Sequence, residues 1–393
     1  MKTPYGHLSY CSNIHTGEIW SEHFAQLNQH VPAVKAQVSP DQPMGLGLRF
    51  ANQASIDLQD PAELKALQSW LTEQNLYVFT LNGFPYGGFH NTIVKDQVHA
   101  PDWTTTDRRD YTIRLAHILA SLLTENEGGI STSPLSYKYW WNTAEERQQA
   151  MRASTQHLLE VVDALAEIEK KTGKIIHIDI EPEPDGLLSN HGDFVAWYEQ
   201  VLLPAGNPDL IRRHVQLCFD ICHYGVSFDA PESSIQELKA KNIPVGKIQI
   251  SSALRVDLRT QEAEKITELQ KYQEPVYLHQ VKALRKDGSY QEFKDLDEAF
   301  AAYLPGTYDE WRVHFHVPLF LETYGLLGST QKEIRETLAI QKASPFTNHL
   351  EIETYTWGVL PAAYQVPTAQ SISREIKTIT DLLGCCKRQP LSM

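Results

Sequence analysis

The sequence predicts an α/β fold, a single closed (β/α)₈ barrel with insertions after the first and sixth strands. Two observations lead to this prediction. Short strand-like runs alternate with amphipathic helical segments, and such alternation builds a mostly parallel sheet because each return to the same edge needs a helical crossover. About eight of these units occur in 393 residues, which favours a closed barrel over an open doubly wound sheet. The expected boundaries are 1–384 for the barrel and 385–393 for a short polar tail.

The predicted strands are short runs rich in apolar and β-branched residues. In chain order they are His7–Asn13, Leu76–Asn82, Gly129–Ser133, Ile175–Glu181, Val215–Asp220, Val245–Ser251, Val313–Pro318 and His349–Tyr355. Two gaps between them are long and define the insertions. The first, residues 14–75, is expected to hold an extra hairpin or excursion around Leu46–Phe50. The second, residues 252–312, contains the turn signal Lys286–Gly288, which predicts a hairpin.

Helix start signals stand between the strands. Asp60 before Pro61 is a favourable N-cap followed by proline at the first helical position. Two segments, Thr143–Glu146 and Thr330–Glu333, have the spacing of capping boxes, in which the threonine and glutamate side chains each accept a bond from a backbone N–H. The helix after the first box carries apolar residues at helical spacing and is expected to end at Gly173.

Several predicted strands alternate polar and apolar residues, although strands of an all-parallel sheet are normally apolar on both faces. The alternating runs are IIHIDIEPEP, VGKIQIS, VHFHVPLF and HLEIETYTW. An antiparallel sheet with one solvated face would give the same pattern, but it needs short hairpins, and the gaps here are mostly about 25–45 residues. We therefore favour the second interpretation, in which the polar face lines the barrel interior and converges near its mouth, where barrel enzymes place their chemistry.

The polar residues at the strand ends are the candidate site. A mixed set of carboxylate, amide and imidazole groups suits Mn²⁺, Mg²⁺ or Co²⁺ and tolerates Zn²⁺. The candidate metal ligands at the strand ends are Glu181 or Glu183, Asp220, the amide oxygen of Gln249, and Glu351 or Glu353, and the candidate substrate-binding residues are His223, Glu183, His314, His316, His279, His15, His90 and Lys247.

Each of these residues has an ordinary structural explanation as well. A glutamate at a strand end is more often a solvated cap or an ion-pair partner than a ligand. His314 and His316 could be core histidines that bond to neighbouring carboxylates. Cys218 and Cys222 are better explained as small buried side chains than as thiolate ligands. The site hypothesis rests on the joint occurrence of the polar groups at successive strand ends.

Two glycine- and aromatic-rich segments are predicted to be loops at the barrel mouth. Leu81–Trp103 follows the second predicted strand, and Ser131–Trp141 begins at the end of the third. Their rings could stack on a polyol or an aromatic metabolite, while burial is the ordinary fate of such rings. We expect the ligand to be a small-molecule metabolite.

Charge and composition argue against other classes. With 35 Lys+Arg and 49 Asp+Glu, the formal net charge is −14, which is a poor match to nucleic acid. No run approaches the ~18 apolar residues of a membrane span, so no membrane insertion is expected. The N-terminal stretch has no apolar core of a secretory signal. Five cysteines, few and odd in number, suit a reduced compartment, so we expect a cytoplasmic protein.

Four site positions, Glu181, Asp220, His223 three residues later, and Glu353, together resemble the xylose isomerase-like TIM barrel superfamily. That superfamily includes sugar isomerases, ketose epimerases, inosose dehydratases and endonuclease IV. The resemblance implies that Glu181 and Asp220 are the first two metal ligands and that His223 contacts the substrate. It implies that Glu353 is the last ligand and a proton-transfer base.

Longer strings extend the resemblance over nearly the whole chain. They are similar to the metabolite traffic protein EboE family, from a bacterial gene cluster for traffic of a secondary-metabolite precursor, which implies other proteins of that cluster as partners. The epimerases carry a metal-binding histidine on strand six, where this sequence has Gln249; His279, His314 and His316 are candidate replacements. The strings are YCSNIHTGE, FTLNGFPYGGFH, IEPEP, FDICH, VGKIQISSAL, YLHQV, HFHVPLF and LEIETYTW.

Two functions follow as hypotheses. The first is a divalent-metal-dependent sugar isomerase or epimerase acting on a small polyhydroxylated or carbonyl metabolite, with Glu181 and Glu353 moving the proton. The second is a non-catalytic metabolite-binding or traffic protein that uses the same polar mouth. A third, an endonuclease IV-like phosphodiesterase, fits the fold but not the charge.

Overall fold

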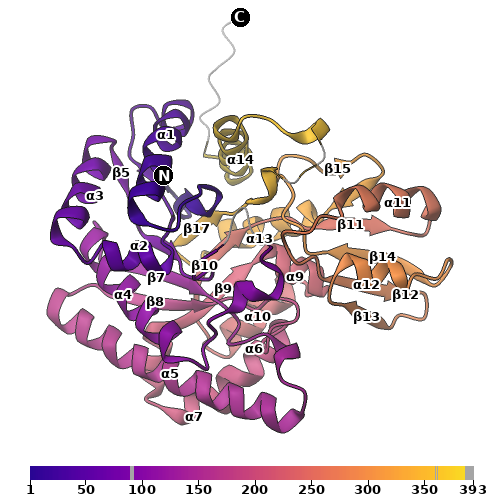
Figure 1. The fold of residues 1–393 in the computed structure, drawn as a ribbon, viewed down its shortest axis with the longest axis horizontal. Helices are drawn as coiled ribbons and strands as arrows, with labels where there is room; N and C mark the ends of the chain where they lie inside the picture. The colour runs from indigo at the N-terminus through magenta and orange to yellow at the C-terminus, as the bar shows by residue number, and fades with distance from the viewer. Residues whose placement is uncertain (89–92, 359, 361, 386–393) are drawn as a thin grey trace, which may run out of the picture.

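The structure, a computed structural model, describes residues 1–88, 93–358, 360 and 362–385. Its main sheet has nine strands and is strongly curled (Figure 1). All neighbouring pairs are parallel except β1 with β2. In spatial order the strands are β1 (Lys2–Thr3), β2 (Gly6–Tyr10), β17 (His349–Ile352), β10 (Val245–Ile250), β9 (Val215–Asp220), β8 (Ile175–Ile180), β7 (Glu127–Thr132), β6 (Thr80–Asn82) and β4 (Leu48–Arg49).

The two sides of the curled sheet meet between β2 and β4. Cys11 and Gly47 form an isolated parallel bridge. The Gly47 N–H donates to the Tyr10 carbonyl at 3.0 Å, and the Ser12 N–H donates to the Gly47 carbonyl at 2.8 Å. A parallel pair, β3 (Met44–Gly45) with β5 (Leu76–Tyr77), precedes β4 and β6 along the same two chain segments.

Helices join the successive parallel strands and cover the outside of the sheet. The main hydrophobic core lies between these helices and the apolar face of the strands. The helices are α1 (Trp20–Val38), α2 (Asn52–Asp57), α3 (Pro61–Glu73), α4 (Thr106–Leu122), α5 (Ala144–Thr172), α6 (His191–Trp197), α7 (Leu203–Ala205), α8 (Pro208–His214), α9 (Ile221–Ser227), α10 (Pro231–Ala240), α13 (Gln331–Ala343) and α14 (Thr368–Leu383).

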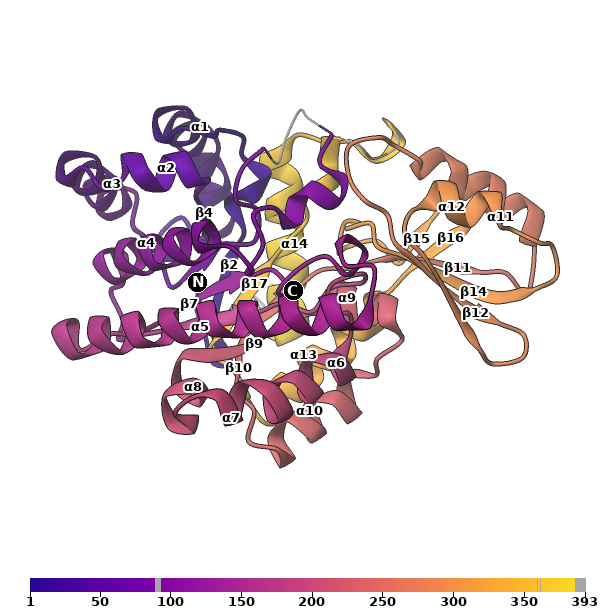
Figure 2. The ribbon, with the colours of Figure 1, turned by 60° about the horizontal axis from the view of Figure 1, so that its bottom comes forward.

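A second, antiparallel sheet is inserted between β10 and β17, to one side of the main sheet (Figure 2). It has its own hydrophobic core, which includes the buried Trp311. The predicted Asp-Gly hairpin is confirmed and joins the first two strands in spatial order. The elements are β13 (Tyr290–Phe293), β12 (Val281–Arg285), β14 (Tyr308–Val313), β11 (Leu254–Asp257), β16 (Leu327–Ser329) and β15 (Thr323–Tyr324), with helices α11 (Glu262–Leu269) and α12 (Leu296–Ala301).

The strand prediction was wrong at two places. Leu48–Arg49 is a main-sheet strand, although we predicted an insertion there. The prediction missed this strand because a strand of two residues is too short to show a periodic apolar pattern. Val313–Pro318 is not a main-sheet strand, because β14 ends at Val313 in the second sheet. The alternation of residues 313–317 is nevertheless real. Phe315 and Val317 face the second core, while the two histidines between and before them face the site.

The polar face of the main-sheet strands does line the concave interior. The buried Lys247 ammonium on β10 donates to Ser131 Oγ on β7 at 2.9 Å and lies 2.5 Å from Glu351 Oε2 on β17. Strands β7 and β10 are separated by β8 and β9, so this contact crosses the interior. Below it, His177 bonds to Asp179, whose Oδ1 lies so close to Gly246 that an added Cβ would sit 1.8 Å away.

One predicted capping box is confirmed and the other is not. At α5, Thr143 Oγ1 accepts from the Glu146 N–H while the Glu146 carboxylate accepts from the Thr143 N–H, and the helix ends at Gly173 with φ +73°. At α13, the Thr330 side chain makes no cap bond. Its hydroxyl instead accepts from the Ala253 N–H at 2.8 Å, so a tertiary contact to the segment after β10 replaces the local one.

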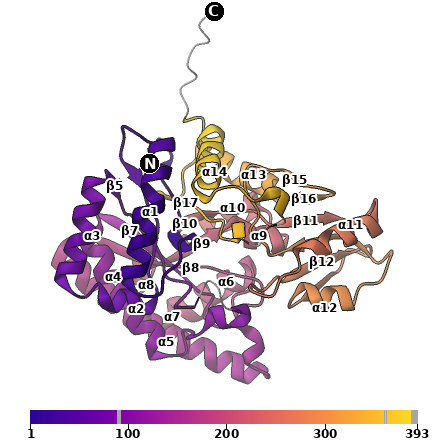
Figure 3. The same cartoon turned by 45° about the horizontal axis from the view of Figure 1, so that its top comes forward.

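The C-terminal helix α14 packs beside α1 and α13 (Figure 3). Its buried Glu375 reaches into the molecule and ties two segments together. Glu375 Oε1 accepts from the Leu319 N–H at 3.1 Å and from Thr354 Oγ1 at 2.8 Å. Leu319 and Thr354 follow, within a few residues, the side chains His316 and Glu353 of the candidate site.

Candidate metal centre

Three buried carboxylates gather at the C-terminal end of the main sheet. Glu181 follows β8, Asp220 ends β9 and Glu353 follows β17. One oxygen of each lies within 4.8 Å of one oxygen of the others. Glu181 Oε2 accepts no hydrogen bond from the described residues. The parallel strands therefore bring together three of the four predicted metal ligands.

The fourth predicted ligand, Gln249 on β10, lies among the three carboxylates. Its side-chain NH₂ group is 3.0 Å from Glu181 Oε1 and 3.1 Å from Asp220 Oδ2, and it also donates to Glu353 Oε2. An amide carries two N–H protons and cannot satisfy three carboxylates fully. The cluster is therefore short of positive charge or of donors.

Burial and mutual repulsion show in the acidity of these groups. Burial, and then the neighbouring carboxylates, raise the pKa of Glu181 and of Glu353 well above its ordinary value. Burial alone would raise the pKa of Asp220 too, but His223 and His316 outweigh it and hold that pKa below its usual value. A divalent cation would remove the repulsion, so the carboxylates fit a hard metal ion.

Three donors around the cluster were not predicted. Asn13 and Asn82 each donate to Glu353 Oε1, at 2.6 and 2.8 Å. Ser251 Oγ donates to Asp220 Oδ1 at 2.6 Å. Each fixes one carboxylate oxygen, while Gln249 holds the other oxygen of Glu353 and of Asp220, and residues around metal sites orient the ligands in this way. Both asparagines stand in quoted strings, YCSNIHTGE and FTLNGFPYGGFH, and their place at strand ends was the available signal.

Beside the carboxylates lie three imidazoles with one shared property. In each ring Nδ1 lies close to a carbonyl oxygen. His223 Nδ1 is 2.9 Å from the backbone oxygen of Pro182, and His316 Nδ1 is 3.1 Å from the backbone oxygen of Glu353. His314 Nδ1 is 2.7 Å from the side-chain oxygen of Gln280. A carbonyl only accepts, so Nδ1 carries the proton in each ring and Nε2 presents a lone pair.

Two of these Nε2 atoms are in direct contact. His223 Nε2 and His314 Nε2 are 3.2 Å apart, and His316 Nε2 makes no hydrogen bond with the described residues. Burial lowers the pKa of all three, for His316 to about 4, so a shared proton does not explain the contact. Imidazoles whose Nδ1–H is held by a carbonyl are typical metal ligands.

Further side chains complete two ligand sets with these histidines. One atom each of Glu183, His223 and His314 lies within 4.8 Å of the others, and the same holds for Asp220, His223 and His316. Glu183 Oε2 is 3.6 Å from His99 Nε2, and burial raises the pKa of Glu183 to about 8. Cys222 also lies near His314 and His316, but burial raises its thiol pKa well above normal, as expected for a buried side chain rather than a thiolate.

The cavity over this centre measures about 60 Å³ and has two kinds of wall. Its floor is polar, with Glu181, Glu183, Glu353, the three histidines and both asparagines, whereas Asp220 and Gln249 do not line it. Apart from Lys95, the rest, which we call the apolar wall, comes from the chain after β6, from the insertion and from the segment after β17. The apolar wall consists of Phe84, Pro85, Val94, Val98, Tyr277, Leu278 and Tyr355.

Three predicted substrate-binding residues do not line the cavity. His15 is buried 3.1 Å from the Tyr10 hydroxyl and stacks on His30. His279 lies behind the site, bonded to Glu274 and to the His314 carbonyl. Lys247 is held deeper in the interior by its contact with Glu351. His90 lies outside the described residues.

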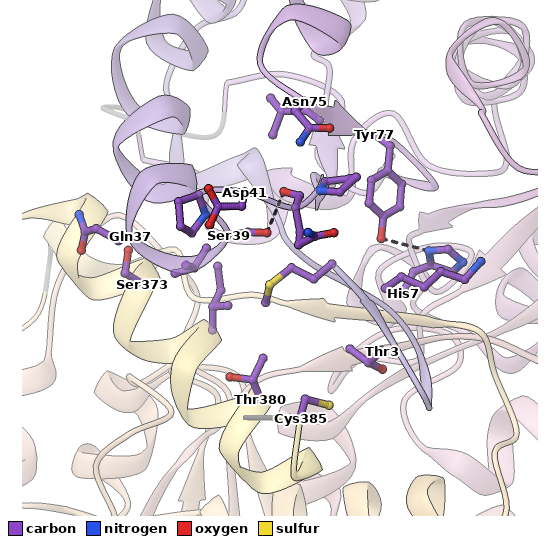
Figure 4. Close-up of a pocket in the computed structure, with 18 of the residues that line it drawn as sticks. Thr3, His7, Gln37, Ser39, Asp41, Asn75, Tyr77, Ser373, Thr380 and Cys385 are labelled. Carbon is purple, nitrogen blue, oxygen red and sulfur yellow. Dashed lines mark hydrogen bonds between the residues drawn. The ribbon is translucent and has the colours of Figure 1, made fainter. Parts of the chain in front are cut away.

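A larger cavity of about 1250 Å³ lies at the other end of the main sheet, between the N-terminal hairpin, residues 37–43 and α14 (Figure 4). Its rim includes His7, whose Nδ1 is 3.1 Å from the Tyr77 hydroxyl. This is the N-terminal end of the parallel strands, where barrel proteins keep stability rather than chemistry. None of the clustered carboxylates lines it.

No helix among the described residues is long and apolar enough to span a membrane. No protein-family model and no curated protein matches the chain. Solved structures do match.

The IolI protein with a bound zinc atom is 11% identical to this chain. The match covers 98% of this chain and 100% of the IolI chain, with a TM-score of 0.51. A sugar phosphate isomerase/epimerase-like protein from Anabaena variabilis is 11% identical over 97% of this chain and 99% of its own, with a TM-score of 0.50. A xylose isomerase domain protein from Planctomyces limnophilus is 10% identical over 98% of this chain and 100% of its own, with a TM-score of 0.49.

At these identities the likeness concerns the fold alone. The likeness concerns the curled, mostly parallel sheet with its helical crossovers. The chain therefore has a fold like that of the IolI protein and of the Anabaena variabilis protein.

Proposed function

We propose that this protein is a divalent-metal-dependent isomerase or epimerase that moves a proton on a small oxygen-bearing metabolite. The observation that carries the proposal is the cluster of Glu181, Asp220 and Glu353 beside three imidazoles with inward lone pairs. The proposal includes closure of the main sheet as an eight-stranded barrel, supported by the Cys11–Gly47 bridge. The zinc atom of the IolI structure, a fold neighbour, is consistent with a metal here.

The ion would be held by Glu181, Asp220 and Glu353, with Gln249 turning its side-chain oxygen inward in place of the NH₂ group. A bound divalent ion supplies Lewis acidity, which polarises two neighbouring substrate oxygens and acidifies the C–H beside them. Mn²⁺, Mg²⁺, Co²⁺ and Zn²⁺ all accept this ligand set.

The protein's own groups would do the proton transfer. Glu181 Oε2, which accepts no hydrogen bond from the described residues, is placed to take a proton from carbon. Glu353, held by Asn13 and Asn82, faces the same cavity and returns a proton to the same or the adjoining carbon. His223 lines the same floor, where it would contact the substrate oxygens.

Gln249 favours a second candidate function, a metabolite-binding protein without catalysis. Its NH₂ group bonds to all three carboxylates at once, an arrangement that holds the cluster together without an ion. Such a protein would bind its ligand in the absence of metal. The wider proposal for either function is a role in the traffic of a secondary-metabolite precursor between proteins of one gene cluster, and it rests on the EboE-like strings of the sequence.

Solvent-proton exchange tests the first function. Metal-stripped protein is reloaded with Mn²⁺ and incubated in D₂O with a panel of small hydroxy-ketones and ketoses, and loss of the carbon-bound proton is followed by NMR. We expect metal-dependent exchange that is lost in Glu353→Gln while the circular dichroism spectrum and melting temperature stay unchanged. Exchange at the same rate in folded Glu353→Gln, or none with any compound, would contradict it.

A further inference from the structure

The cavity walls restrict the ligand further than the metal chemistry does. Besides the polar floor and Lys95, the described lining consists of the apolar wall, in which Tyr277 and Tyr355 alone carry a hydroxyl. Many of the floor groups are already bonded to one another: both asparagines are held by Glu353, and the histidine Nδ1 atoms by carbonyls. Among the described lining residues, the groups left for a ligand are chiefly carboxylate oxygens of Glu181 and Glu183 and the Nε2 atoms of the histidines.

The charge of the cavity argues against an anionic ligand. Among the described lining residues, Lys95 is the one lysine or arginine. Its ammonium is 2.6 Å from Asp295 Oδ2, so its charge is already paired. Three carboxylates, Glu181, Glu183 and Glu353, line the same cavity. A phosphate bears about two negative charges and is normally bound by unpaired Arg or Lys or by free backbone N–H groups.

The apolar wall argues against a fully hydroxylated ligand. A hydroxyl facing Val98 or Leu278 would lose its bonds to water and gain none from those side chains, which weakens binding by on the order of tenfold for each hydroxyl.

We propose that the ligand is a small uncharged hydroxy-ketone or diol, with its two oxygens adjacent at one end and the remaining carbons unsubstituted, rather than a free sugar or a sugar phosphate. The two oxygens face the carboxylate and histidine floor, and the carbons face the apolar wall. This inference rests on the proposed function for the role of the metal, but it concerns which molecule the cavity accepts, whether or not turnover follows.

Three probes of graded polarity test it. Acetoin and dihydroxyacetone have the same number of non-hydrogen atoms, but dihydroxyacetone has one more oxygen and one fewer carbon. Dihydroxyacetone phosphate adds negative charge. Their binding to Mn²⁺-loaded protein is measured from the paramagnetic broadening of their proton resonances, with metal content checked first. We expect acetoin to bind at least tenfold more tightly than dihydroxyacetone, and the phosphate to bind no more tightly than dihydroxyacetone.

A variant of the wall gives a second arm. Val98→Thr adds a hydroxyl without changing shape and should reduce the preference for acetoin severalfold while leaving metal content unchanged. Val201→Thr, in a helical segment away from the cavity, is the matched control and should leave the preference as it is.

Equal or tighter binding of dihydroxyacetone or its phosphate, or no binding of acetoin, overturns the inference. The proposed function then still stands if exchange depends on metal and on Glu353. Failure to bind metal at all is instead a failure of the proposed function.

Discussion

At the scale of single residues, the site depends on what surrounds each ligand rather than on the ligands alone. Glu181, Asp220 and Glu353 were predictable because each stands at the end of a strand-like run. The role of Gln249 as a donor to all three was not, because a sequence does not say which way an amide faces. Nor were the carbonyl partners of the three histidines, which come from distant segments.

Replacement of Gln249 tests this view of the centre. In Gln249→His, an imidazole lone pair replaces an amide that donates to the carboxylates, so we expect Mn²⁺ or Zn²⁺ affinity to rise by about tenfold or more. Competition with a fluorescent chelator measures it. Gln216→His, on the neighbouring strand β9 but outside the carboxylate cluster, is the control and should leave affinity unchanged. An unchanged or lower affinity in Gln249→His would show that the carboxylates do not form the metal site.

At the scale of elements, local signals predicted helices better than strands. The capping box at Thr143 formed because that helix begins in solvent, whereas the Thr330 hydroxyl is taken by the Ala253 N–H. Strand β4 was missed because it is two residues long. The alternation of 313–317 predicted the right faces but the wrong sheet, since periodicity reports burial and not pairing partners.

Helix α14 carries an element-scale prediction through Glu375. Burial raises the pKa of this carboxyl to about 8, against about 4.3 in an unfolded chain. Between these values the folded state binds more protons than the unfolded state, so this group makes stability fall as pH rises, by about 1.4 kcal/mol per pH unit. The effect is complete above the folded-state pKa and absent below the unfolded-state one.

Glu375→Gln keeps an oxygen that accepts from Leu319 and Thr354 but cannot ionise. We therefore expect the variant to gain stability relative to the wild type as the pH is raised from 5 to 8, with the two proteins closest at low pH. Urea unfolding across that range measures it. Parallel stability curves for the two proteins would mean that Glu375 does not carry the shifted titration.

At the scale of the whole molecule, two cores share one site. The main sheet contributes the carboxylates, and the inserted sheet, with its separate core, leads into the segment that carries His314 and His316. The alternating barrel-like pattern was visible in the sequence because every crossover needs a helix. The size of the insertion was visible too, but its antiparallel sheet and its contribution to the cavity depend on long-range packing that spacing does not encode.

The central claim is that the carboxylate cluster holds a divalent metal ion, and its most direct test is the metal content of the chain. Protein purified without chelator is analysed by inductively coupled plasma mass spectrometry beside Asp220→Asn and, as the matched control, Asp179→Asn, a buried interior carboxylate paired with His177 outside the cluster. We predict at least about one equivalent of Mn, Co, Zn or Mg in the wild type and in the control, and a loss in Asp220→Asn. A folded wild type that holds no divalent ion even after incubation with these metals would contradict the claim and leave the metal-free binding function in its place.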